Sequence, residues 1–314
     1  MINAKIENVQ ILHPRNPTDV EQRNSMLTTS LRDGVLPWRF QHEYPLVLSD
    51  DHLETSWCLY ADSKLAAHAN LWPRILSHQT SSRSIKIGIV GNVVTHPDFR
   101  GCGLMSAVFA HLTSVAKNQD MQALVLWSDL LEFYQKLGFS SIGREIRFVL
   151  GASDRRVDTG IRKVDVSQLS DDDLAKMLSL RPAQEWQLNR SITEFRSLLG
   201  IPNTALFIRR RGSRITSWFA VGKGSDMQGV IHEWGATSAI ELVNDVLTII
   251  SAWQLPHLTI LTPANLPKLW KDEIESHSTQ KSEHNMALGL SFGSNGPSVL
   301  STLARSFLWG FDSI

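Results

Sequence analysis

The chain has 314 residues, which is long for one domain and sufficient for two. Its 31 basic and 31 acidic residues balance, so no net charge favours nucleic acid or a membrane surface as a partner. The only cysteines, Cys58 and Cys102, are far apart, and the chain shows no signal segment, membrane-spanning run or metal-ligand spacing, which together favour a cytoplasmic protein without a disulfide framework.

The first half predicts a strand and a helix followed by consecutive antiparallel strands. In chain order the elements are a strand over 5–12, a helix over 17–31, a hairpin of strands 55–61 and 65–76, and a strand over 84–95. Residues 32–54 show no regular pattern. After the glycine-rich turn described next come a helix from Leu104, a strand over 123–127, a short helix to Leu137 and a hairpin over 140–150.

A strand, a glycine-containing loop and a helix N-terminus meet between Gly91 and Ser106. The β-branched run stops at His96-Pro97, and apolar residues at helical spacing begin at Leu104. The first turn of a helix has backbone N–H groups without partners and a partial positive charge, which suits an anion. Glycines in the loop let the backbone approach a phosphate closely, and Arg100 adds a positive charge.

Several phosphate loops contain such glycines. A Walker loop is excluded because Leu104-Met105 occupy the place of its Lys and Ser or Thr. A dinucleotide fingerprint starts where the strand ends, whereas Pro97 and its neighbours intervene here. An ordinary glycine-rich turn before a helix also stays open as an interpretation.

Two motifs together resemble the GNAT superfamily of N-acetyltransferases. Arg100 and Gly103 match the pyrophosphate loop of that family, although Met105 stands where the family usually has a small residue. Further on, Leu131-Glu-Phe-Tyr-Gln-Lys-Leu-Gly-Phe139 resembles the aromatic stretch near the end of GNAT domains, in the same order along the chain. The resemblance covers residues 1 to about 150.

The resemblance implies a co-substrate, acetyl-CoA, and a set of site residues. The backbone of Val93, Val94 and Thr95 would hold the pantetheine arm and polarise the thioester carbonyl, and Tyr134 would be the general acid. The reference pKa of tyrosine, about 10, leaves it protonated at neutral pH. The diphosphate would lie against the loop and first helical turn, formed by Arg100, Gly101, Cys102, Gly103, Leu104, Met105 and Ser106. Tyr134 as a merely half-buried aromatic side chain is the alternative.

No residue is identified as the general base. His96 is more simply a solvated turn residue, and Asp129 a helix cap. A helix predicted over 297–308 precedes an aromatic tail that ends at Ile314. In the enhanced-intracellular-survival type of aminoglycoside acetyltransferase, the last carboxylate of the chain reaches the active site, so we hypothesise that the Ile314 carboxylate acts as base.

The second half repeats the order of the first. A helix starts at Ser170, strands follow over 204–210, 215–221 and 230–234, and a helix over 239–253 precedes a strand over 258–262. Where the first half has its anion loop, Ser238 and Glu241 form a capping box that would occupy the same N–H groups. The resemblance therefore implies an α/β protein of two tandem GNAT-like domains, 1–152 binding the cofactor and 153–314 degenerate. Each domain would have a mixed, mostly antiparallel sheet flanked by helices.

Polar residues of the second half have mainly structural interpretations. His232 and Glu233 are expected to be ordinary edge residues, with an acceptor cleft as the alternative. The arginines that flank the turn near Gly212 are expected to be solvated: Arg209, Arg210, Arg211 and Arg214.

The function expected from the sequence is transfer of an acyl group from acetyl-CoA to an amine, either a small molecule or a peptide. A non-catalytic CoA-binding sensor or scaffold is the alternative, because Met105 would crowd the loop. A non-enzymatic interaction protein is the third option.

Overall fold

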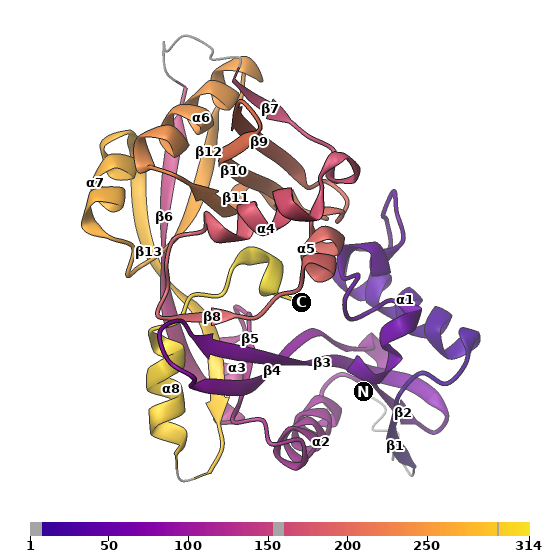
Figure 1. The fold of residues 1–314 in the computed structure, drawn as a ribbon. Coiled ribbons are helices and arrows are strands. Elements are labelled where there is room, and N and C mark those ends of the chain that lie inside the picture. The colour runs from indigo at the N-terminus through magenta and orange to yellow at the C-terminus, as the bar shows by residue number, and fades with distance from the viewer. Residues whose placement is uncertain (1–7, 153–159, 294) are drawn as a thin grey trace. The chain divides into compact units, whose positions relative to one another are not determined.

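A computed structural model describes residues 8–152, 160–293 and 295–314, which form two compact units (Figure 1). Unit 1 contains Met1–Ile142, Ala287–Leu303 and Ser313–Ile314, and unit 2 contains Gly143–Met286 and Ala304–Asp312. Most of the predicted boundary, 151–160, lies outside the described residues, so the division into domains 1–152 and 153–314 stays a proposal.

The elements of unit 1 follow the predicted order. The structure places β1 at Val9–Leu12, α1 at Pro17–Leu31, β2 at Ser56–Ala61, β3 at Lys64–His78, β4 at Ser84–Thr95, α2 at Leu104–Asn118, β5 at Ala123–Leu126 and α3 at Leu131–Lys136. The predicted irregular stretch contains two 3₁₀ helices, η1 at Phe40–Glu43 and η2 at Asp50–Thr55, and a third, η3, follows β4 at Pro97–Phe99. Lys5 to Glu7 of the predicted first strand lie outside the described residues.

Local capping explains where α1 begins. The Asn16 side chain accepts a hydrogen bond from the Asp19 N–H at 2.9 Å, and Pro17 occupies the first turn, where no N–H is needed. The N-terminus of α2 is different, because Gly103 precedes it in a left-handed conformation and no side chain caps it.

The sheet of unit 1 is mostly antiparallel. β1, β2, β3 and β4 pair antiparallel in sequence order, β4 pairs parallel with β5, and β5 pairs antiparallel with Leu288–Ser291 of β13 (Ser278–Ser291). The apolar face of α2 packs on one side of this sheet in a buried cluster that includes Leu59, Ala67 and Val90. Buried polar side chains lie between the other side and α1, where Arg23 contacts Ser56.

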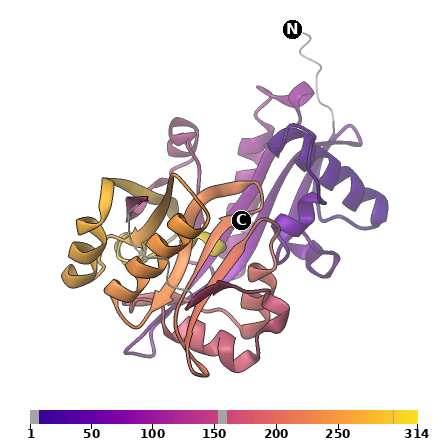
Figure 2. The same cartoon turned by 90° about the horizontal axis from the view of Figure 1, so that it is seen from above.

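Unit 2 repeats the arrangement with its own elements. They are β6 at Ser140–Gly151, which enters unit 2 at Gly143, β7 at Ile161–Lys163, η4 at Val166–Gln168, α4 at Asp171–Ser179, β8 at Trp186–Leu188, α5 at Ile192–Leu199, β9 at Ala205–Arg211, β10 at Arg214–Lys223, β11 at Asp226–Ala236, α6 at Ala239–Ala252, β12 at His257–Pro263 and α7 at Lys268–Ser276. α8 (Gly296–Ala304) and η5 (Gly310–Asp312) complete the chain. The strands of unit 2 lie between α6 on one face and α4 and α5 on the other (Figures 1 and 2).

The order β9–β10–β11–α6–β12 corresponds to β2–β3–β4–α2–β5 of unit 1. In both units the strands before and after the long helix pair in parallel, β4 with β5 and β11 with β12. The predicted internal repeat therefore has a structural counterpart, and the chain has the mixed, mostly antiparallel sheet flanked by helices that the sequence indicated.

One prediction at the end of the first half is wrong. Residues 140–150 do not form a hairpin but one continuous strand, β6, whose residues Glu145–Gly151 pair with β12 in unit 2. In unit 1 the place beside β5 is taken by β13, which the sequence did not predict. Each unit thus completes its sheet with a strand from the other half of the chain. Within the described ranges, no helix is long and apolar enough to cross a membrane.

Candidate functional site

β4 has an edge without a strand partner at its C-terminal end. Its pairing with β5 ends at Ile89 opposite Val125, whereas its pairing with β3 continues to Thr95 opposite Ala67. From Val90 to Thr95 the side of β4 toward β5 therefore has no strand partner among the residues that the structure describes. Backbone groups on such an edge can pair with an extended ligand. The predicted pantetheine-binding residues, Val93, Val94 and Thr95, lie on this segment.

The same segment contains a β-bulge. Asn92 and Val93 of β4 together oppose the single residue Ala69 of β3, and Asn92 has a φ of +48°. Two buried polar side chains of β3 contact Asn92: the Asn70 Oδ1 accepts from its side-chain amide at 3.0 Å, and the His68 Nδ1 lies 2.9 Å from its carbonyl oxygen. Sequence reasoning missed His68 and Asn70, although two polar residues that alternate with alanine within an apolar stretch of the strand were a visible signal.

The glycine loop leads from β4 into an uncapped helix. Gly101 and Gly103 have φ of +78° and +74°, a left-handed backbone that suits glycine. Gly101, Cys102 and Gly103 are exposed, and no side chain accepts a hydrogen bond from the first turn of α2. The Arg100 side chain folds back onto β4, where its Nε lies 3.3 Å from the Thr95 carbonyl oxygen. The predicted anion loop and the predicted pantetheine segment are therefore adjacent.

The first turn of α2 has a buried side and an exposed side. Leu104 and Met105 point into the apolar cluster, with Met105 only 9% exposed, whereas Ser106 is exposed. The Met105 side chain therefore packs beneath the helix and does not crowd the loop. Crowding by Met105 was the reason for considering a CoA-binding sensor or scaffold.

Tyr134 lies in a buried aromatic cluster. Its side chain is 4% exposed and contacts the rings of Phe109, Phe133 and Phe139 edge to face. Burial raises its pKa to about 12, against a hydrogen bond with Ser128 that lowers it. The phenol is therefore protonated at any physiological pH, as a proton donor must be.

Other predicted polar residues of unit 1 have minor local roles. His96 caps η3 by accepting from the Asp98 N–H, and its side chain is 40% exposed. The prediction of Asp129 as a helix cap is wrong, because Asp129 is exposed and does not cap α3; the Ser128 hydroxyl accepts from the Leu130 N–H.

The tail returns to β4. A Cβ built on Gly91 would overlap the carbonyl group of Ile314, so only glycine leaves room for this contact. The role of the Ile314 carboxylate as base stays a prediction.

The corresponding helix end in unit 2 is occupied. The Ser238 hydroxyl accepts from the Glu241 N–H at 3.2 Å, as the predicted capping box requires. The Glu241 carboxylate does not complete that box; it binds the Thr237 and Thr216 hydroxyls and pairs with Arg211. A hydroxyl and a negative charge thus stand where unit 1 has open N–H groups and glycine.

Three predictions about unit 2 are wrong, each because tertiary packing buries the residue. His232 is fully buried and its Nε2 lies 3.0 Å from the Gly222 carbonyl oxygen. Glu233 is fully buried between Arg181 and Arg190, at 3.2 and 2.7 Å. Arg209 is buried against Asp245 and is not solvated.

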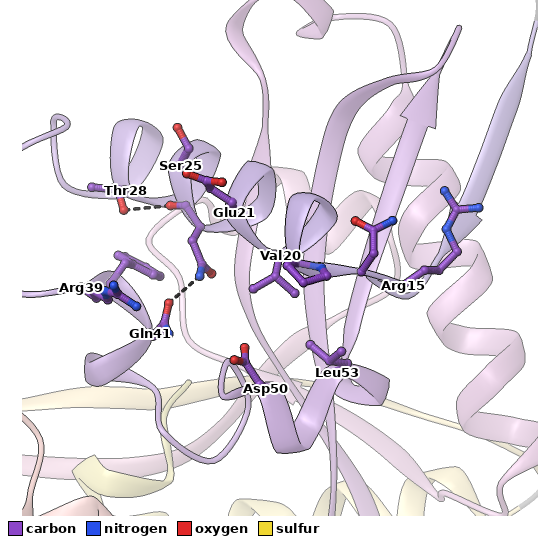
Figure 3. A pocket seen from close by; sticks show the side chains of 13 residues that line it. Arg15, Val20, Glu21, Ser25, Thr28, Arg39, Gln41, Asp50 and Leu53 are labelled. Atoms are coloured by element: carbon purple, nitrogen blue, oxygen red, sulfur yellow. Dashed lines mark hydrogen bonds between the residues drawn. The ribbon is translucent and has the colours of Figure 1, made fainter.

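A cavity of about 790 Å³ opens along α1 (Figure 3). α1 supplies one wall, with Glu21 among its residues, and the segment from Arg39 to Leu53 supplies the other, with Asp50. The Asn24 side chain crosses between the walls to Gln41 Oε1 at 2.5 Å. The volume is within the range of pockets for small ligands, about 300–1,000 Å³.

Comparison with known proteins agrees with this geometry. Residues 14–142 match the family model described as an acetyltransferase (GNAT) domain. No curated protein sequence matches the chain.

Many solved structures share the fold. A conserved protein of unknown function from Enterococcus faecalis V583 is similar with a TM-score of 0.69 and 13% identity, over 91% of this chain and 73% of that one. A GCN5-related N-acetyltransferase from Kribbella flavida is similar with a TM-score of 0.63 and 15% identity, over 91% and 72%. The N-myristoyltransferase of Saccharomyces cerevisiae, solved with bound myristoyl-CoA, is similar with a TM-score of 0.57 and 11% identity, over 92% and 84%. Residues 14–142 are therefore similar to a GNAT acetyltransferase domain, and the chain shares the fold of GNAT N-acetyltransferases.

Proposed function

We propose that the protein is an acyl-CoA-dependent N-acyltransferase that transfers acetyl from acetyl-CoA to a primary amine. The observation that carries the proposal is the continuity of an unpaired strand edge, a glycine loop and an uncapped helix N-terminus. An extended pantetheine arm pairs with such an edge, and a diphosphate accepts hydrogen bonds from such a helix end.

Each part of the site has a role in the transfer. The amides of Val93, Val94 and Thr95 hold the pantetheine arm and polarise the thioester carbonyl. The amine nitrogen attacks that carbonyl carbon, so that the C–N bond forms and the C–S bond breaks. The Tyr134 hydroxyl donates its proton to the leaving thiolate, and the amine loses a proton to a base. Gly101 to Ser106 bind the diphosphate.

We propose that the acceptor occupies the cavity along α1. Glu21 and Asp50 place a carboxylate on each wall, and neither acid has an ion-pair partner among the described residues. Two arginines, Arg15 and Arg39, also line the cavity, and Arg15 pairs with Asp19. The two carboxylates are therefore the groups that a protonated amine would contact. Glu21→Gln and Asp50→Asn are expected to raise the KM for the amine with little change in the KM for acetyl-CoA. A rise in the KM for acetyl-CoA alone would place the acceptor elsewhere.

Release of free CoA thiol, measured with acetyl-CoA and a panel of primary amines, tests the function. We expect release that depends on the amine. Binding of acetyl-CoA without release in the presence of any amine would indicate a sensor or scaffold instead. Absence of thermal stabilisation by saturating acetyl-CoA would contradict both and favour an interaction protein.

A further inference from the structure

The bulge in β4 decides which backbone groups face the open edge. Along a strand, the N–H and C=O of successive residues point to alternate sides. The extra residue in β4 therefore changes which of Val93, Val94 and Thr95 point toward β3 and which toward the edge without a strand partner. A straight strand with the same sequence would present a different set of amides to a ligand.

The bulge needs external support because its backbone is strained. Asn92 has a φ of +48°, a left-handed backbone conformation that residues other than glycine rarely adopt. Asparagine tolerates this conformation better than most residues. Such strain persists where the surroundings fix it. Asn92 is 6% exposed, so its support comes from the protein and not from solvent.

Asn70 supports the side chain of Asn92. Its Oδ1 accepts from the Asn92 Nδ2 at 3.0 Å, and its own Nδ2 lies 3.1 Å from both the Val47 carbonyl oxygen and the Ser56 hydroxyl. Ser56 in turn accepts from the fully buried Arg23 at 3.0 Å. Because Asn70 is held from several directions, its position is fixed before any ligand binds.

His68 supports the main chain of Asn92. A carbonyl oxygen only accepts, so the His68 Nδ1 carries the proton that it donates to the Asn92 carbonyl at 2.9 Å. His68 is fully buried and its Nε2 has no hydrogen-bond partner in the described part of the chain. The only hydrogen bond of the imidazole within the described part of the chain is therefore the one to the bulge.

We propose that His68 and Asn70 are positioning residues that clamp the β4 bulge at Asn92 and thereby aim the amides of Val93 to Thr95 at acyl-CoA. This inference rests on the proposed function, because it assigns these two side chains a part in binding the acyl donor. It makes the buried polar face of β3, opposite the α2 core, a determinant of CoA affinity.

The test separates the bulge from general stability. Asn92→Val disfavours the left-handed backbone, and we expect it to weaken CoA binding by at least about tenfold, measured as the calorimetric Kd. Asn92→Gly adopts the same backbone freely, and we expect a Kd close to that of the wild type. Glu43→Gln is the matched control, because Glu43 is buried in the same unit and binds Arg32 and Trp38 instead of the bulge.

A rescue experiment keeps the inference testable if Asn92→Val does not fold. We expect Asn70→Leu to raise the Kd for CoA several-fold, and Asn70→Leu/Asn92→Gly to return toward the wild-type Kd while the loss of thermal stability remains. Wild-type affinity in Asn70→Leu, or a double variant as weak as Asn70→Leu, overturns the clamp. Lack of CoA binding by the wild type overturns the proposed function, and the clamp with it.

Discussion

The Tyr134 side chain is buried, and its hydroxyl is protonated. Because burial raises its pKa to about 12, the hydroxyl stays protonated across the pH range of an ordinary assay. Motif comparison alone identified the residue, and the aromatic cluster around it explains why it holds one orientation.

Tyr134→Phe is expected to keep the ring contacts and remove the proton. We predict that kcat falls by about 10²–10⁴-fold, the usual size of a general-acid contribution, with little change in the Kd for CoA. The wild-type rate should show no decline between pH 8 and about 10 that is due to this group. An unchanged kcat in steady-state assays would show that Tyr134 is only a packing residue.

Gly91 is the residue on which the tail contact depends. A Cβ at this position would overlap the Ile314 main chain, so Gly91→Ala should displace residues 313–314. We predict a destabilisation of about 1–3 kcal/mol in denaturant unfolding, the usual cost of overpacking.

Deletion of Ser313 and Ile314 supplies the control. If Gly91→Ala acts through the tail, it should cost little further stability in the shortened chain, so the two changes should not be additive. The deletion also tests the Ile314 carboxylate as base, because unchanged turnover would exclude that role.

The proposed binding of a diphosphate at the N-terminus of α2 depends on the left-handed backbone of the glycine that precedes the helix. Gly103 and Gly34 have φ of +74° and +75°, and neither has an atom within 4 Å of a built Cβ. Alanine at either position should therefore cost a similar backbone strain, about 1–2 kcal/mol. The two glycines differ in place, since only Gly103 lies in the proposed diphosphate site.

We predict that Gly103→Ala weakens CoA binding while Gly34→Ala does not, at a similar loss of thermal stability. Calorimetric titration of both variants with CoA measures this directly. Equal affinities would mean that the α2 N-terminus does not hold the ligand.

Local pattern was sufficient to predict most elements but not their partners. Pro17 marked the start of α1, and Leu104 the start of α2, because helix-start residues and apolar periodicity are local signals. β13 was not predicted, because Ser278 to Asn285 is polar and shows little alternation of apolar and polar residues. Its pairing with β5 is determined by tertiary packing, for which the local sequence gives no signal.

The same limit applies to the candidate site. The left-handed turn at the loop glycines could be predicted, because glycine is the residue that suits such a backbone best. The contacts at Asn92 could not, because they depend on side chains that two strands bring together. In unit 2, the predictions for His232 and Glu233 were wrong because alternation along a strand does not reveal that both faces of the strand are buried. It also does not reveal the ion pairs of Glu233 with Arg181 and Arg190.

At the scale of the whole molecule, each unit buries a neutral histidine. Burial lowers the pKa of His68 in unit 1 and of His232 in unit 2 to about 3. An unfolded histidine has a pKa of about 6.5, so the unfolded chain binds more protons between these values. The stability that these residues contribute is fully present above pH 6.5 and is lost as the pH falls toward 3.

We predict that unfolding free energy decreases below pH 6.5 by about 1.4 kcal/mol per pH unit for each histidine. His68→Gln should be less stable at pH 7.5 and should lose less stability on acidification, as measured by denaturant unfolding at pH 7.5 and 5. The same pH dependence in the variant as in the wild type would show that His68 is not the titrating group.

Hydrogen exchange of the intact chain with and without CoA tests most directly whether the diphosphate lies at the start of α2. We expect CoA to slow exchange in peptides that cover residues 91–106. Protection of residues 234–241 in the second half, or no protection at saturating CoA, would contradict the proposed site.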